Sequence, residues 1–498
     1  MRTASVLLLV AGCFLASAQY AGRQPIPERY KSGTDAIQIA TAKQDLTFLA
    51  TQCDGRGTGQ PGFFRAADYI AEKFKEAGLK PVGDGGTYFQ HVPFFHYGID
   101  ATQSYLASGD GTTKVVGPQN ISFGRLGTDV DQTAPALIIR ARGADAQVQS
   151  VDALKSKIVI VISDSDSTKL RRQLVNQGAV ALVWVRQALD PGLGTVSRNK
   201  GGGDGDLNDV EVAPDAAKRL CEALTGNDDG MDTSKTSPNT ADEIDPKSSL
   251  RMVAKGSEEP LGVPNVVGLL EGSDPKLKKE IVGIGAHLDH LGRNGSTVYP
   301  GADDDGSGST AVLEIVDAFK AGRIKPKRSI LFMTFCGEEM GLLGSGYYSD
   351  HPIFPHDEMI AELQMDMVGR DSEGPQNGDA NRVDKKADNV DTIRLVGSKR
   401  ISTDLDKLIE ADNKYVGFRF KWDAEDVYER SDHYNFAKHG IPIAFLFDGF
   451  HPDYHRPTDT VDKIDWVKLT NAAKLYYIVA LDLANNPTPP RHDVLSGG

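Results

Sequence analysis

The chain has 498 residues, 40% of them hydrophobic and 25% charged, which is the composition of an ordinary soluble globular protein. This length exceeds what a single hydrophobic core normally supports, so we expect two domains. The formal net charge of −14 excludes the strongly basic surface on which nucleic-acid binding depends.

The first 18 residues predict a signal peptide. Arg2 precedes an apolar run at residues 6–15, and the Ala-Ser-Ala triplet at 16–18 has the small-x-small pattern of a cleavage site. The run is too short to span a bilayer and no later run is long enough, so we expect no stable membrane insertion. A second interpretation takes the Val-Ala-Gly-Cys sequence ending at Cys13 as a lipoprotein box, with Cys13 lipidated. Either route predicts export, to the periplasm or the extracellular medium.

Cleavage after residue 18 leaves three cysteines, Cys53, Cys221 and Cys336. Their spacing matches no zinc or redox motif, and three cysteines allow at most one disulfide within the chain. We therefore expect mostly buried thiols.

The next part of the chain is predicted to contain two helices and a strand, followed by an inserted domain. Residues 36–50 and 61–77 have helical patterns, and 87–95 resembles a strand. From about residue 112 short β-rich runs appear, at 136–140, 158–162 and 181–185. Two polar tracts rich in glycine and aspartate, 199–209 and 226–249, are predicted to be loops. We therefore expect a domain at 112–252, inserted between the two parts of a larger domain, 19–111 and 253–490, with a tail at 491–498.

After the insertion, apolar strands alternate with helices. Strands are predicted at 281–285, 329–335 and 361–367, helices at 309–321 and 339–349, and a surface loop at 371–391. Near-continuous apolar strands separated by helices indicate an α/β fold, with a mixed, mostly parallel sheet between helical layers. In such sheets the functional side chains gather beyond the carboxyl ends of the strands.

Two polar motifs follow or precede these elements directly. His287 and Asp289 stand two apart at the end of a strand, so an extended backbone points both side chains to one side. A carboxylate behind a histidine is typical of a metal ligand, although His-x-Asp alone is more often structural. Asp303, Asp304 and Asp305, bordered by glycines, lead into the helix at 309–321. Capping a helix needs one aspartate, so three suggest a backbone bent around a cation.

Two more motifs add carboxylates. Glu338 and Glu339 are adjacent where the strand at 329–335 ends; such a pair can be a solvated turn, or can bind metal with one carboxylate and handle protons with the other. Asp366 lies in an apolar strand, where a carboxylate is costly unless it is paired or coordinated.

The last motif contains His455, followed by a turn and Asp459, with Tyr428 and a Ser-Asp-His triplet at 431–433 upstream. Taken together, a His, Asp, Glu, Asp and His each lie at or beyond the end of a predicted strand. That ligand set suits zinc or a similar divalent metal, with two ions sharing one bridging carboxylate.

The five motifs are, in order, His-x-Asp, Gly-Ala-Asp-Asp-Asp-x-Ser-Gly, Gly-Glu-Glu-x-Gly, Met-Asp-Met and Tyr-His-x-Pro-x-Asp-Thr. This order resembles the co-catalytic dizinc exopeptidases, which include bacterial leucyl-type aminopeptidases and glutamate carboxypeptidases. The resemblance spans about 263–483 and the N-terminal helices. The insertion at 112–252 resembles the protease-associated domain of many members.

The resemblance implies a role for each site residue. Asp304 corresponds to the carboxylate that bridges two Zn²⁺ ions, Glu338 to the general base, and Asp289 to the residue that orients a histidine ligand. Tyr428 corresponds to a tyrosine that steadies the oxyanion, although some family members have a disulfide around it and no cysteine flanks it here. The remaining zinc ligands would be His287 and Asp366 on one ion, and Glu339 and His455 on the other.

The function implied is that of an exported, zinc-dependent aminopeptidase that removes N-terminal residues from peptides, using a water between the metals and a glutamate base. A carboxypeptidase of the same family is the main alternative, and would use a basic clamp such as Arg370, Arg430 or Arg456 for the substrate carboxylate. A one-zinc glutaminyl cyclase and a non-catalytic, receptor-like protein are further alternatives, and the full ligand set argues against both.

Overall fold

The chain divides into two compact units. The first combines Met1–Val92 with Gly262–Gly498, and the second is Pro93–Leu261. The computed structural model describes residues 20, 22–100, 102–123, 129–148, 154–165, 168–187, 189, 195–197 and 208–493. The predicted signal peptide, Cys13, most of the polar tract at 199–209 and the end of the tail lie outside the described residues.

The second unit is wider than the predicted insertion at 112–252. Its boundaries fall inside two long strands, β2 (Phe89–Ile99) and β13 (Gly256–Leu270), which run from one unit into the other. The second unit therefore begins before residue 112 and ends after residue 252, the bounds expected from the sequence.

The first unit is built on a mixed sheet whose centre is parallel. Strand β14 (Ile281–His287) pairs in parallel with β17 (Ser329–Phe335) and with β18 (Met359–Met365), and β18 pairs in parallel with β23 (Ile443–Phe447). Every residue of β14, β17 and β18 is buried. Within the first unit the order is β22-β21-β23-β18-β14-β17-β13-β2, with β1 beside β13; the remaining bounds are β22 (Arg419–Lys421), β21 (Thr392–Val396) and β1 (Lys80–Pro81). Strand β9 (Thr195–Ser197) pairs with the part of β2 that lies in the second unit, at Phe95–Tyr97.

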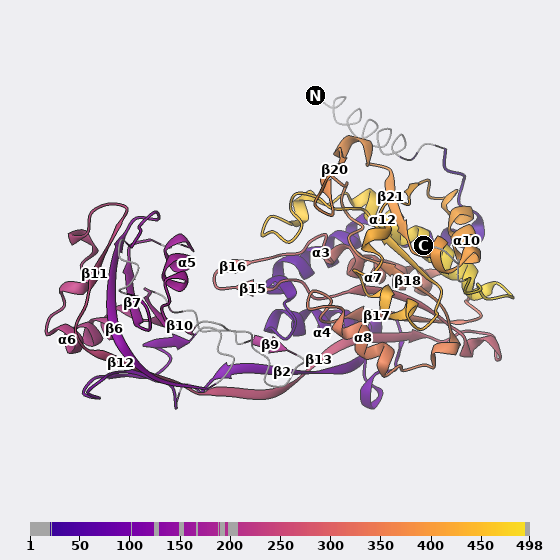
Figure 1. The fold of residues 1–498 in the computed structure, drawn as a ribbon. Coiled ribbons are helices and arrows are strands. Elements are labelled where there is room, and N and C mark those ends of the chain that lie inside the picture. Colours follow the sequence, from indigo (N-terminus) through magenta and orange to yellow (C-terminus); the bar gives the residue numbers. More distant parts are fainter. Residues whose placement is uncertain are drawn as a thin grey trace, which may run out of the picture. The chain divides into compact units, whose positions relative to one another are not determined.

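Helices cover both faces of this sheet. Phe332 of β17 packs against Phe74 and Phe319, on helices α4 (Pro61–Glu76) and α7 (Gly306–Ala321). Phe335, on the opposite face of the same strand, packs against Tyr348 and Phe436, on α8 (Leu343–Asp350) and α11 (His433–Ala437). The predicted α/β architecture is therefore confirmed (Figure 1). The other helices of this unit are α2 (Glu28–Thr34), α3 (Ile39–Gln52), α9 (Ser398–Ile401), α10 (Thr403–Asn413) and α12 (Trp466–Asn485).

Local differences from the sequence prediction arise in polar segments. Helix α8 begins at Leu343 rather than at 339, because the chain turns at Gly341 and Leu342, whose φ values are 102° and 59°. The predicted loop at 371–391 contains a hairpin of β19 (Gly374–Gln376) and β20 (Asp379–Asp384). Because this hairpin is largely exposed, its strands lack the apolar alternation on which the prediction relied. A second small hairpin joins β15 (Arg293–Asn294) to β16 (Thr297–Val298).

The second unit has its own sheet, with a helix on each face. In β7 (Ile158–Ser163), Ile158, Ile160 and Ile162 share a buried core with Leu220 of α6 (Pro214–Thr225). The alternate residues Val159 and Val161 share another core with Leu170 of α5 (Thr168–Asn176). The strand order of this sheet is β4-β3-β12-β6-β7-β8-β10-β5, with β11 beside β6. The bounds of its other strands are β4 (Lys114–Val115), β3 (Tyr105–Ser108), β12 (Ser249–Ala254), β6 (Val130–Arg142), β8 (Ala181–Val185), β10 (Asn208–Val212), β5 (Ile121–Phe123) and β11 (Thr240–Ile244). Strand β11 lies in the tract 226–249 that was predicted to be a loop.

Cys53, Cys221 and Cys336 are all buried. In the part of the chain that the structure describes, no helix has both the length and the apolar character needed to cross a bilayer.

Candidate metal centre

The predicted site residues lie at one edge of the sheet, where the parallel strands end. His287 is the last residue of β14, Glu338 and Glu339 follow β17, and Asp366 follows β18. Because these strands are parallel neighbours, their carboxyl ends lie side by side. Asp304 reaches the same edge from the loop before α7, and His455 from the loop after β23.

The three consecutive aspartates have three different tasks. Asp305 is the N-cap of α7: its Oδ1 accepts hydrogen bonds from the backbone N–H of Gly308 at 2.8 Å and of Met367 at 3.1 Å. Its Oδ2 accepts one from the N–H of His287 at 3.1 Å. One buried carboxylate thus joins the start of α7 to the ends of β14 and β18. Asp303 accepts from the N–H of Gly369 at 2.8 Å, which leaves Asp304 to face the site.

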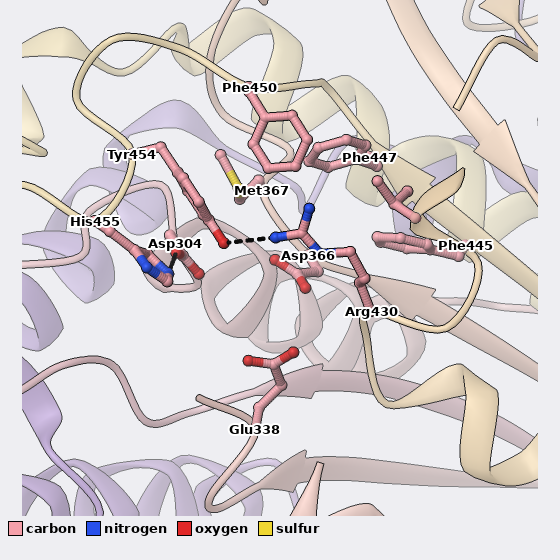
Figure 2. A pocket seen from close by; sticks show the side chains of 11 residues that line it. Asp304, Glu338, Asp366, Met367, Arg430, Phe445, Phe447, Phe450, Tyr454 and His455 are labelled. Atoms are coloured by element: carbon pink, nitrogen blue, oxygen red, sulfur yellow. Dashed lines mark hydrogen bonds and ion pairs between the residues drawn. The ribbon is translucent and has the colours of Figure 1, made fainter. Parts of the chain in front are cut away.

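Asp304 lies between two groups of possible ligands. Its Oδ1 is 3.2 Å from Nε2 of His287, which is also 3.5 Å from Oδ1 of Asp366. Its Oδ2 is 3.1 Å from Nε2 of His455, which is also 3.0 Å from Oε2 of Glu339. Figure 2 shows Asp304 beside His455 and facing the pocket. The structure therefore brings all five predicted ligands together, with one oxygen of Asp304 directed to each group.

The electrostatics of this cluster favour a bound cation. Burial alone would lower the pKa of His287, but the carboxylates of Glu338, Asp366 and Asp304 hold it well above its usual range. Burial also opposes protonation of His455, yet Asp304 and Glu339 raise its pKa to about 10. Such a negative potential suits a divalent ion, and the donor set of imidazole nitrogens and carboxylate oxygens fits zinc. By hydrogen-bond geometry, neither Oδ2 of Asp304 nor Oε1 of Glu339, both buried, has a partner among the described residues.

The two adjacent glutamates point to different places. Glu339 faces His455, whereas Glu338 lines the pocket with its Oε2 3.9 Å from Nε2 of His287. Burial raises the pKa of Glu338 well above its usual range; His287 opposes the shift, and Asp366 and Glu339 add to it. A carboxylate with a raised pKa at the pocket wall suits a proton acceptor.

Asp289 contacts His287 through its main chain, whereas the sequence interpretation expected its carboxylate to make this contact. Nδ1 of His287 is 2.9 Å from the backbone carbonyl of Asp289, and 3.8 Å from its carboxylate. The carboxylate instead accepts from the hydroxyl of Thr58 at 2.7 Å and from the N–H of Glu338 at 3.1 Å. Asp289 therefore orients the imidazole through its main chain and fixes the loop that carries Glu338 through its side chain.

Tyr428 does not line the pocket. It directly follows the short 3-10 helix η8 (Glu425–Val427), and the guanidinium carbon of Arg400 lies 4.1 Å from its ring centroid. Its ring also packs edge-on against Tyr434 at 5.9 Å. The residue that presents a phenol to the pocket is Tyr454, whose hydroxyl oxygen is 3.3 Å from Nη2 of Arg430 (Figure 2). The one sequence feature that could have indicated Tyr454 is its position immediately before His455, on the same loop.

His290 is a second residue to which the sequence assigned no role. It is 2% exposed, and its Nδ1 lies 2.7 Å from Oε1 of Glu339 and 3.7 Å from Oδ2 of Asp304. His290, Asp304 and Glu339 form a second group that could hold a metal, beside His287, Asp304 and Asp366. Its position one residue after Asp289 was the available signal.

A pocket that is open to solvent lies beside these groups. Figure 2 shows an aromatic wall facing the carboxylates, with Glu338 on the opposite side from Phe450. A cation and a phenol, Arg430 and Tyr454, lie between the two. The apolar lining consists of Met367, Val427, Phe445, Phe447 and Phe450, and the polar lining of Asp304, Glu338, Asp366, Arg430, Tyr454 and His455.

The fold and this cluster define an α/β protein with two adjacent groups of candidate metal ligands that share one carboxylate, Asp304. Residues 265–479 match the model of peptidase family M28. A probable leucine aminopeptidase of Arthroderma otae is 34% identical over 230 residues, which cover 44% of this chain and 58% of that relative. Aminopeptidase YwaD of Bacillus subtilis is 26% identical over 235 residues, which cover 46% of each chain. The chain thus spans less than two thirds of the length of these curated relatives. A solved aminopeptidase structure from Aneurinibacillus sp. strain AM-1 is 22% identical, with 93% of this chain and 96% of that chain covered and a TM-score of 0.48.

Proposed function

We propose that this protein is a zinc-dependent aminopeptidase with two ions in one site, which hydrolyses the first peptide bond of its substrates. The observation that carries the proposal is Asp304, one oxygen of which faces His287 and the other His455, with Glu338 on the wall of the adjoining pocket. The two relatives described above, a probable leucine aminopeptidase and an aminopeptidase, support the same class.

The zinc pair, when bound, supplies a Lewis acid that polarises the scissile carbonyl and makes the attacking water more acidic. Glu338 accepts the proton of that water and passes it to the leaving amine, because its carboxylate lines the pocket and its pKa is raised by burial. The two ions would be held by His287, Asp304, Asp366, Glu339 and His455.

Tyr454 is the residue we assign to the developing oxyanion. Burial and the carboxylates of Asp304 and Glu339 raise the pKa of its phenol, so the hydroxyl stays protonated at neutral pH. Arg430 donates a hydrogen bond to the phenol oxygen, which leaves the phenol hydrogen free to donate to substrate. A protonated donor at this position is what an oxyanion requires.

The pocket offers little to bind a substrate carboxylate. Arg430 is the one guanidinium or ammonium among its described lining residues, and two of the three lining carboxylates, Asp304 and Asp366, are assigned to the ions. Of the other two candidate clamps, Arg370 is buried and pairs with Asp453 at 3.0 Å, and Arg456 is exposed and does not line the pocket. A carboxypeptidase would therefore depend on Arg430 alone, which already binds Tyr454.

The aromatic wall supports a preference for substrates with an apolar N-terminal side chain. Phe445, Phe447 and Phe450 offer large apolar surfaces on the side of the pocket away from Glu338 (Figure 2). Burying an apolar side chain there is favourable by about 25 cal/mol per Å² of apolar surface removed from water.

The test is a set of peptides of one sequence that begins with leucine, supplied free, N-acetylated and C-amidated. Acetylation should abolish turnover, because the free amine is lost, and amidation should be tolerated. The opposite pattern would establish a carboxypeptidase. Elemental analysis of protein purified without chelator should approach two zinc equivalents per chain; saturation at one would favour the one-zinc cyclase.

Export and a protease-associated role for the second unit belong to the same proposal. The signal-like sequence before residue 19 supports export, and N-terminal sequencing of the secreted protein should begin at Gln19. The two-faced, strand-rich core of the second unit supports its interpretation as an accessory domain.

A further inference from the structure

His290 lies in the loop after β14, wedged against the loop that carries the aspartates. Its backbone N–H donates to the carbonyl of Arg56 at 3.2 Å. Its ring lies so close to Gly301 that a Cβ there would be 2.5 Å from Cγ of His290. Gly301 also has a φ of 54°, so a side chain at this position is disfavoured twice. The glycine therefore makes room for an imidazole beside Asp304 and Glu339.

Three buried polar atoms meet at this imidazole. One is Nδ1 of the imidazole itself. The other two are Oε1 of Glu339, 2.7 Å from Nδ1, and Oδ2 of Asp304, 3.7 Å from Nδ1. By hydrogen-bond geometry none of the three has a partner within the described residues. Buried polar atoms without partners are costly, and a cation between them would satisfy all three at once.

We propose that Nδ1 of His290 is a fourth protein ligand of the ion bound by Asp304, Glu339 and His455. The inference rests on the proposed two-zinc function and adds a ligand to it. The two ions then differ: one is bound by two imidazoles and two carboxylates, the other by His287, Asp304 and Asp366. Four protein ligands close the coordination of zinc, whereas three leave a position open.

The difference in ligand number predicts a difference in affinity. The ion at His290 and His455 should bind more tightly than the ion at His287 and Asp366. Stepwise dialysis of the full chain against increasing chelator should therefore pass through a form with one zinc per chain. This stoichiometry is measured on the protein itself and does not depend on turnover.

The experiment compares His290→Ala and His290→Asn. Alanine removes the ring, whereas asparagine places an amide nitrogen close to the position of Nδ1 and can still donate to Glu339. We expect both variants to lose the tightly bound zinc, measured by titration against a competing chelator. The affinity should fall by more than the roughly 10- to 100-fold that loss of an outer hydrogen-bond partner causes.

His433→Asn is the matched control. His433 is also fully buried, and its ring stacks on Phe445 with centroids 4.6 Å apart. This variant should keep both zinc affinities, which separates ligand loss from the general cost of removing a buried imidazole. Thermal unfolding of each metal-free variant checks that it is folded.

Two results would overturn the inference. If His290→Asn keeps the tight zinc and His290→Ala loses it, His290 only positions Glu339 by a hydrogen bond. If both variants keep two zinc ions at unchanged affinity, His290 is no ligand. Failure of the proposed function looks different, because the unsubstituted chain would then bind no zinc at all or would not cleave the free peptide.

Discussion

At the scale of single residues, the adjacent Glu338 and Glu339 offer the sharpest test of the site. Glu338→Gln keeps the shape of the side chain but removes the proton acceptor, so folding and both zinc ions should survive. Turnover of the leucyl peptide should fall by about 100- to 10,000-fold, the usual value of a general base. Steady-state kinetics and elemental analysis on the same preparation measure the two effects.

Glu339→Gln is the matched change at the neighbouring position. It should weaken zinc binding, because Glu339 lies 3.0 Å from His455 in the second ligand group, and added zinc should partly restore turnover. If instead Glu338→Gln loses a zinc and Glu339→Gln does not, the two roles are reversed. If neither change alters turnover, the reaction takes place elsewhere.

The two tyrosines can be separated in the same way. Tyr454→Phe removes the hydroxyl that faces the pocket, and kcat should fall by about 100- to 1,000-fold, as for other oxyanion donors. KM and zinc content should change little. Tyr428→Phe should leave kcat within a few-fold, because that ring packs against Arg400 and does not line the pocket. A larger loss of kcat in Tyr428→Phe than in Tyr454→Phe would return the oxyanion role to Tyr428.

The structure brings the five predicted ligands together, but it also adds neighbouring residues that the sequence did not indicate. His287, Glu339 and Asp366 sit at strand ends, where an unusual polar residue in an apolar pattern stands out. Tyr454 and His290 are next to His455 and Asp289 in the sequence. Their proposed roles depend on the directions of their side chains, which the spacing of residues along the sequence does not predict. Tyr428 was placed by resemblance, and the turn at η8 puts its ring against Arg400 instead.

At the scale of elements, helix α7 connects the site to the core. Asp305 caps it and also holds the ends of β14 and β18, so one residue fixes three elements. The sequence predicted α7 and the central strands well because their apolar patterns are long. It missed the hairpin of β19 and β20, because exposed strands carry no such pattern.

Helix α7 also contains a buried carboxylate, Glu314, that should make stability depend on pH. Burial raises its pKa to about 7; Thr41 and the N–H of Gln38 oppose the shift, and Asp317 and Asp45 add to it. Between the ordinary glutamate pKa and pH 7, the unfolded chain therefore ionises first and binds fewer protons. The contribution of this group to stability falls as pH rises through that window, by about 3 kcal/mol in total.

Glu314→Gln removes the titration and keeps an oxygen for the N–H of Gln38, which Glu314 accepts at 2.8 Å. Relative to the unsubstituted protein, the variant should gain stability on going from pH 4.5 to pH 8, as measured by urea unfolding at both values. Glu28→Gln, at an exposed glutamate, is the control for loss of a charge. A stability difference that is the same at both pH values would show that Glu314 titrates normally.

At the scale of the whole molecule, the N-terminal segment is part of the site's support. The buried guanidinium of Arg56 donates to the carbonyls of Leu288 at 2.8 Å, Pro300 at 2.8 Å and Gly301 at 2.7 Å. These carbonyls lie beside His287 and Asp304, two of the proposed metal ligands, in the sequence. Contacts over more than two hundred residues leave no local pattern, so the sequence predicted the helices of this segment but not its role.

The metal ions should be a major source of stability for the first unit. Without cations, Asp304, Glu339 and Asp366 repel one another in a buried cluster, where unpaired charges are costly. A ligand that binds only the folded state stabilises it by about 2.7 kcal/mol when its concentration is 100 times its Kd. We therefore expect the midpoint of thermal unfolding to fall in excess chelator and to rise with zinc concentration afterwards.

Hydrogen exchange read out by mass spectrometry shows where that stability is located. Chelation should increase exchange in the peptides that contain the ends of β14 and β18 and the loop at His455, because these segments supply the ligands. Peptides of β7 and β8, in the core of the second unit, serve as an internal control and should exchange unchanged. In Asp366→Asn, zinc should change the unfolding midpoint and the exchange less, because a ligand has been removed. In Glu338→Gln, zinc should change both as much as in the unsubstituted protein. If elemental analysis shows that the zinc has been lost and neither the midpoint nor the exchange of these segments changes, the carboxylate cluster is stable without cations and the metal contributes only to the reaction.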